Sequence, residues 1–154
     1  MTSRRDFLIA AAGTAGGISL AVTSGRAHAT PAEMQDAVRK VTGGAPVRSG
    51  RVKLDVPPLI DNGNAVPLSV AVESPMTPSD HVKSIHVVTE RNPLPNVVSV
   101  HLGPRAGRAR FATRVRLADT QTVIAIAEMS DGSFWSDSVH VVVTLSACLE
   151  EGLI

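Results

Sequence analysis

The chain has 154 residues, with 15 basic and 14 acidic side chains and a single cysteine, Cys148. This length suits one domain, and the near balance of charge does not indicate a nucleic-acid-binding protein. Because a lone cysteine cannot form an intramolecular disulfide, the apolar core has to hold the fold together.

Residues 1–29 are predicted to be a twin-arginine signal peptide rather than part of the fold. Arg4 and Arg5 stand in the sequence Ser-Arg-Arg-Asp-Phe-Leu, which resembles the twin-arginine export signature. A weakly apolar stretch rich in Ala and Gly follows, and Ala27-His28-Ala29 fits the rule of small residues at a cleavage site. The apolar stretch is too short and too rich in glycine for a membrane-spanning helix, so no stable membrane insertion is expected. We predict cleavage after Ala29 and a periplasmic mature protein.

Export would place Cys148 in an oxidising compartment. Cleavage after Ala29 would leave 125 of the 154 residues, with 12 basic and 13 acidic side chains. An unpaired thiol in the periplasm is exposed to unwanted oxidation and intermolecular pairing. This favours a functional role for Cys148 over that of an inert buried thiol.

Residues 31–41 are predicted to form a short helix. Thr30 can cap its N-terminus, Pro31 suits its first turn, and Gly43-Gly44 ends it. Its apolar stripe consists of Met34, Ala37, Val38 and Val41.

After residue 44 the apolar periodicity changes from helical to alternating, which predicts strands. The predicted strands are residues 52–56, 68–72, 84–89, 97–102, 109–117, 122–127 and 134–145. Turn signals such as Asp61-Asn62-Gly63-Asn64 and Ser130-Asp131-Gly132 separate them. About seven short strands at this spacing predict a mainly β fold, an antiparallel immunoglobulin-like β-sandwich with a short N-terminal helix. We assign this domain to residues 30–145.

An ordered set of segments extends through most of the predicted domain and resembles a known family. The segments are Asp61–Leu68, Glu73–Met76, Asp80–Val87, Asn92–Pro95, Gly103–Gly107, Arg114–Ala118 and Ala127–Phe134. Together with the twin-arginine signal, they resemble the SoxY family, the sulfur-carrier subunits of the periplasmic thiosulfate-oxidising complex.

The resemblance implies a non-enzymatic carrier that pairs with SoxZ, a second β-sandwich without its own signal. By its position, Cys148 would be joined oxidatively to thiosulfate as a cysteine S-thiosulfonate, and no other cofactor is implied. A C-terminal arm, residues 146–154, would present this sulfur to a c-type haem conjugating enzyme, a dimetal sulfate-releasing hydrolase and a sulfane dehydrogenase. The chemistry requires cysteine, because a thiol forms S–S bonds reversibly near neutral pH through its thiolate.

The arm departs from the family pattern around the cysteine. The family arm ends in Gly-Gly-Cys-Gly-Gly, whereas here Ser146-Ala147 precede Cys148 and Leu149-Glu150-Glu151 follow it. Side chains in place of glycine restrict the backbone. Glu150 and Glu151 would repel thiosulfate and disfavour the thiolate.

Two other interpretations of the same residues remain open. The ligand types of a superoxide-reductase-like iron site are present, namely four histidines and a cysteine: His81, His86, His101, His140 and Cys148. The Cys-x-x-His spacing of that family is absent, so surface or hydrogen-bonded histidines are the default interpretation and no metal site is predicted. The other alternative is a non-catalytic periplasmic interaction domain in which Cys148 has no special role.

Four arginines alternate with other residues along one predicted strand and should share a face: Arg108, Arg110, Arg114 and Arg116. Such a row can be a solvated face that protects a sheet edge. It can also be an electrostatic patch for a partner or for anionic cargo.

Overall fold

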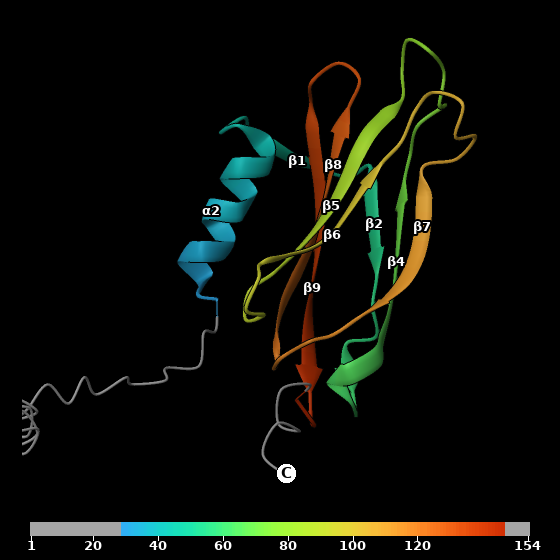
Figure 1. The fold of residues 1–154 in the computed structure, drawn as a ribbon. Coiled ribbons are helices and arrows are strands. Elements are labelled where there is room, and N and C mark those ends of the chain that lie inside the picture. The colour runs from blue at the N-terminus through green and yellow to red at the C-terminus, as the bar shows by residue number, and fades with distance from the viewer. Residues whose placement is uncertain (1–28, 147–154) are drawn as a thin grey trace, which may run out of the picture.

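The computed structural model describes residues 29–146, which form two packed β-sheets with one helix against the outside (Figure 1). The predicted mainly β sandwich with a short N-terminal helix is therefore confirmed. The described residues contain nine strands, against about seven predicted from spacing. The two additional strands are three and two residues long, too short to leave an alternating pattern in the sequence.

The helix α2, Pro31–Thr42, begins and ends where its sequence predicts. The Thr30 side chain accepts a hydrogen bond from the Glu33 backbone N–H, and the Glu33 carboxylate accepts one from the Thr30 N–H. This reciprocal pair is a capping box, which satisfies two backbone donors that the first helical turn leaves free. Gly43 ends the helix with a φ of 62°, a left-handed conformation that glycine adopts without strain.

The larger sheet has the strand order β1-β9-β8-β5-β6, and β3 also pairs with β9. All its pairs are antiparallel except those of β1 and β3, which run parallel to β9. Its strands are β1 (Val47–Ser49), β3 (Leu59–Ile60), β5 (Val82–Thr89), β6 (Asn96–His101), β8 (Gln121–Met129) and β9 (Phe134–Val143).

The smaller sheet has the order β2-β4-β7 and is antiparallel throughout. Its strands are β2 (Val52–Asp55), β4 (Val66–Val72) and β7 (Arg110–Val115), and the short 3-10 helix η1 (Gly63–Ala65) precedes β4. Between β1 and β2 the chain crosses from one sheet to the other at Gly50, whose φ is 123°. The guanidinium groups of Arg48 and Arg51 lie 5.8 and 5.2 Å from the Trp135 ring centroid, on either side of this crossing along the chain.

The core lies between the sheets and consists of Val, Leu, Ile, Ala and Met side chains. On β4 the burial alternates residue by residue, because successive side chains of a strand point to opposite faces. A second apolar cluster lies on the other face of the larger sheet, where Met34 of α2 packs with Val88, Ile126 and Phe134. The predicted apolar stripe of the helix is thus the face that the helix buries.

Residues 1–28 and 147–154 lie outside the described part of the chain. The predicted signal residues Arg4 and Arg5 and the predicted sulfur attachment residue Cys148 are among them. Within the described part, no helix is long and apolar enough to cross a membrane.

We expect Leu117→Ala to lower the free energy of unfolding by about 2–5 kcal/mol, because it leaves a cavity in the core. Leu117 is 0% exposed, whereas Leu59 is 61% exposed and serves as a control with the same change of side chain. Leu59→Ala should cost less than about 0.5 kcal/mol. Urea denaturation of both variants measures the difference, and equal losses would contradict the assigned core.

Candidate functional site

The residues at and just after the end of β9 precede Cys148 in the sequence and are hydrogen-bonded to the domain. The Thr120 hydroxyl accepts a hydrogen bond from the Val143 backbone N–H at 3.0 Å, and the Thr144 N–H donates to the Ile60 carbonyl at 3.0 Å. The Leu145 carbonyl accepts from the Gly63 N–H at 2.8 Å. Leu145 is therefore anchored to η1, three residues before Cys148 in the sequence. The boundary between domain and arm at residue 145 remains a prediction.

A buried polar network organises the same end of the sandwich. The Asn92 side chain donates to the Arg116 carbonyl at 2.7 Å and accepts from the Ala118 N–H at 2.9 Å. It also accepts from the Gln121 side-chain amide at 3.0 Å. Gln121 is fully buried and accepts from the Arg91 N–H. This network fastens the β5–β6 loop to the β7–β8 connection, beside the start of the arm.

The four predicted arginines are exposed on and beside β7, an edge strand of the smaller sheet. Ala109, Val115 and Leu117 beside them are buried, whereas Thr113, which strict alternation would bury, is exposed. None of the four forms an ion pair with another residue of the described range. Their exposure is consistent with both interpretations, edge protection and an electrostatic patch.

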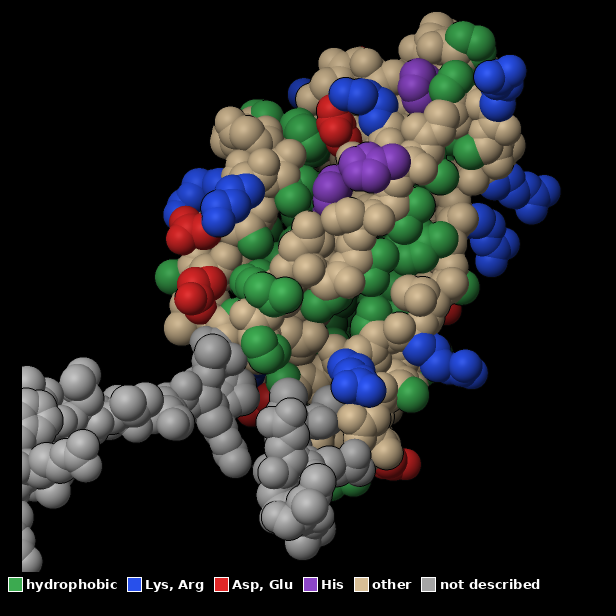
Figure 2. Space-filling view, in the orientation of Figure 1, with side chains coloured by type: hydrophobic (Ala, Val, Ile, Leu, Met, Phe, Trp, Pro, Cys, Tyr) green, Lys and Arg blue, Asp and Glu red, His purple; other side chains and the backbone are tan. Residues whose placement is uncertain are grey.

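A groove of about 600 Å³ lies between the edge strands β6 and β7. Its floor and walls include Leu94, Val97, Val98 and Val115, and Arg114 and Arg116 line its β7 side. Figure 2 shows hydrophobic side chains exposed on this face of the molecule, with basic side chains along one border. The sequence indicated the arginines but not the groove, because β6 and β7 belong to different sheets.

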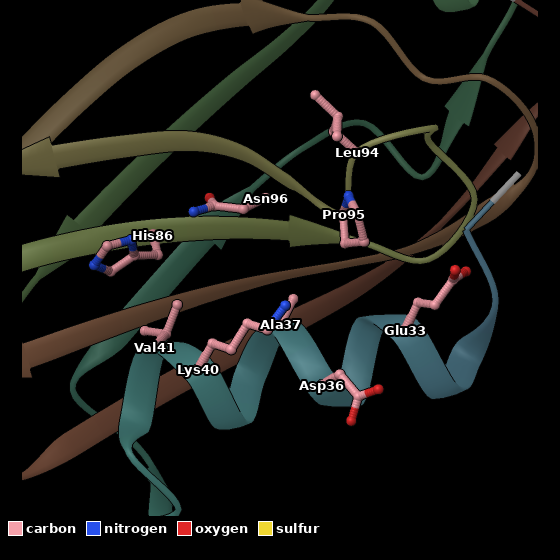
Figure 3. Close-up of a pocket in the computed structure, with 9 residues that line it drawn as sticks. All are labelled: Glu33, Asp36, Ala37, Lys40, Val41, His86, Leu94, Pro95 and Asn96. Atoms are coloured by element: carbon pink, nitrogen blue, oxygen red, sulfur yellow. The ribbon is translucent and has the colours of Figure 1, made fainter. Parts of the chain in front are cut away.

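A second hollow, of about 660 Å³, lies between α2 and the β5–β6 pair (Figure 3). Glu33, Asp36 and Lys40 line it from the helix, and His86 and Asn96 from the strands. Its lining carries both signs of charge, so it has no marked preference for an anion.

His86 belongs to a polar network on the outer face of the larger sheet. Its Nδ1 lies 2.9 Å from the Ser99 hydroxyl, and its Nε2 lies 3.2 Å from the Ser84 hydroxyl. Ser84 in turn donates to Glu128, which pairs with Lys83. Burial, together with the neighbouring His101, lowers the pKa of His86, and the hydrogen bond from Lys83 lowers that of Glu128.

The four histidines are not gathered into one site. His86 and His101 make an edge-to-face contact with ring centroids 6.0 Å apart. His81 lies in the loop before β5, with its Nδ1 3.1 Å from the Thr77 carbonyl, and His140 is exposed on β9. Among the described residues, no group of three or more His, Cys, Asp or Glu side chains could hold a metal ion.

The family model of SoxY, described as sulfur oxidation protein SoxY, matches residues 38–148. This is well over half of the chain, and the match includes Cys148 and stops there. The chain belongs to the SoxY family. Residues 149–154, which carry Glu150 and Glu151, lie beyond the match. A search of curated proteins gives no match.

Solved structures share the fold. The sulfur carrier protein SoxY from Chlorobium limicola f thiosulfatophilum has a TM-score of 0.62 at 24% identity, covering 74% of this chain and 98% of that one. A superoxide reductase (neelaredoxin) from Ignicoccus hospitalis has a TM-score of 0.55 at 15% identity, covering 75% of this chain and 94% of that one. The superoxide reductase from Nanoarchaeum equitans has a TM-score of 0.52 at 12% identity, covering 62% of this chain and 100% of that one. Both kinds of protein therefore share the sandwich, and fold alone does not choose between their functions.

We expect His86 to make this SoxY-family chain less stable in mild acid. Its lowered pKa means that the folded state resists protonation, so the free energy of unfolding should fall as pH drops through about 6.5, the ordinary value in an unfolded chain. Glu128, whose pKa is lowered, adds its own loss only at more acidic pH. His86→Gln should flatten the decline between about pH 7 and 5, whereas the exposed control His140→Gln should not. Urea denaturation across this range measures the slopes, and an unchanged slope in His86→Gln would contradict the assignment.

Proposed function

We propose that this chain is a periplasmic sulfur carrier that binds thiosulfate-derived sulfur covalently on Cys148. The observation that carries the proposal is the family match, which extends from α2 through the domain to Cys148 itself. The anchor at Leu145 supports it, because a carrier thiol should stand just beyond a rigid domain. The chain is then not an enzyme, and its only prosthetic group is the sulfur species on the cysteine.

The proposed loading step is an oxidation. The thiol of Cys148 and thiosulfate join through a new S–S bond, which gives the S-thiosulfonate and releases one proton and two electrons. A c-type haem conjugating enzyme would accept the electrons. Water then cleaves the terminal sulfonate as sulfate at a dimetal hydrolase, which leaves a persulfide on the cysteine, and a sulfane dehydrogenase would oxidise the remaining sulfane sulfur. The thiolate is the reactive form in the first step.

Assembly with a SoxZ-like β-sandwich subunit is part of the same proposal. The edge strands β6 and β7 and the arginines along β7 offer surfaces for such partners. An exposed edge strand carries free backbone donors and acceptors that a partner can cover.

Incubation of the full chain with thiosulfate and the conjugating enzyme should add the mass of thiosulfate to Cys148. Intact-protein mass spectrometry detects the adduct, and Cys148→Ala should show none. A matched variant restores the glycines around the thiol by Ser146→Gly, Ala147→Gly, Leu149→Gly and Glu150→Gly. Loading of that variant but not of the natural chain would overturn the carrier function of this arm. If Cys148→Ala still supports thiosulfate oxidation in cells, the chain is an interaction domain instead.

Export by the twin-arginine route is proposed from Arg4 and Arg5. Replacing both by Lys should retain the full-length precursor in the cytoplasm, whereas Arg26→Lys, in the same predicted signal, should leave export unchanged. Cell fractionation followed by mass spectrometry should find the exported form beginning at Thr30. Equal export of the double variant would contradict the assignment of the signal.

A further inference from the structure

The groove between β6 and β7 combines exposed apolar surface with unpaired positive charge. Leu94 at its margin is 76% exposed, and Val97 and Val98 are only partly buried against the core. Arg114 and Arg116 line the groove and form no ion pair within residues 29–146. Such a surface suits a short peptide that carries both apolar and acidic side chains.

The chain's own tail begins beside this groove. Gly63 connects the two, because its N–H donates to the Leu145 carbonyl while its carbonyl accepts from the Leu117 N–H at 2.9 Å. Leu117 directly follows Arg116, so the anchored end of β9 lies next to the arginine at the mouth of the groove. Glu150 is five positions after Leu145, a step that can extend over about 17 Å, and Arg114 is only about 7 Å further along the chain than Arg116. The acidic residues can therefore reach both arginines.

The residues after Cys148 combine apolar and acidic side chains, which match the apolar and basic lining of the groove. After Cys148 come Leu149, Glu150, Glu151, Gly152, Leu153 and Ile154, two carboxylates among three apolar side chains. These residues lie outside the family match, so they are a feature of this chain rather than of the family pattern.

We propose that residues 149–154 dock in the groove between β6 and β7, with Glu150 and Glu151 against Arg114 and Arg116, and that docking shields Cys148. The thiol precedes the docked segment by one residue, so a docked tail holds it against the domain and a released tail presents it. Partner proteins would gain access by displacing the tail. The inference concerns the same thiol as the carrier function, but its test uses a thiol reagent and no sulfur cargo, so the two can fail separately.

The test is the rate at which neutral iodoacetamide alkylates Cys148 in the full chain, followed by intact-protein mass spectrometry. Arg114→Gln combined with Arg116→Gln should raise the rate about twofold to tenfold, the range expected for the loss of two exposed ion pairs. Arg108→Gln combined with Arg110→Gln, on and beside the same strand but outside the groove lining, is the matched control and should leave the rate unchanged.

The sign of this effect separates docking from simple electrostatics. Removing positive charge near a thiol disfavours the thiolate, so without docking the groove variant would react more slowly. A rate equal to or below that of the natural chain would overturn the proposal. Exchanging the charges by Arg114→Glu, Arg116→Glu, Glu150→Arg and Glu151→Arg should restore slow alkylation.

Nuclear magnetic resonance locates the docked segment directly. Ending the chain after Cys148 should shift the backbone amide signals of Leu94, Val97 and Val98, and leave those of the β8–β9 turn unchanged. Unmoved groove signals would overturn the proposal even if alkylation rates changed. Shifts in the natural chain that disappear on dilution would mean that the groove holds the tail of a second copy, which would overturn docking within one chain.

Discussion

The pairing of β9 is the constraint on which the rest of the structure depends. This strand bonds to β8 along most of its length and to the short strands β1 and β3 on its other side. The carboxylate of Asp137 on β9 also accepts a hydrogen bond at 2.9 Å from the Leu54 backbone N–H of β2, in the other sheet. One strand thereby joins the two sheets, and its C-terminal end carries the chain toward Cys148.

The two sides of the sandwich differ as a result. On the β9 side, Asp137 and the crossing at Gly50 draw β2 against the larger sheet, and the arginines on either side of the crossing in the sequence both lie over the Trp135 ring. On the opposite side, β6 and β7 end their sheets without a connecting contact of this kind, and a groove lies between them. The end of the described chain lies close to this groove, because Gly63 forms backbone hydrogen bonds with both Leu145 and Leu117.

Beside the apolar contact with α2, the outer face of the larger sheet carries a polar network, and its described residues form no group that could hold a metal ion. The buried or half-buried polar groups Ser84, His86 and Glu128 are satisfied by hydrogen bonds within this network, to which the exposed Ser99 also contributes. The superoxide reductases share this sandwich, yet the described histidines are not gathered into one site, and only His86 and His101 contact each other. Function in this fold therefore depends on which side chains are added to the scaffold, and here the family match extends to a single thiol.

The sequence by itself determined the helix from Thr30 to Gly43, the seven longer strands and the position of the cysteine after the last strand, because these depend on local periodicity, capping and turn residues. It also predicted that Arg108, Arg110, Arg114 and Arg116 share a face, since alternation along a strand needs no tertiary information. Only the tertiary structure decided that Asn92 and Gln121 form a buried network, that β1 and β3 pair in parallel with β9, and that Arg114 and Arg116 border an apolar groove. Those features join residues far apart in the chain, and a single sequence contains no local signal for contacts that the packing of two sheets creates.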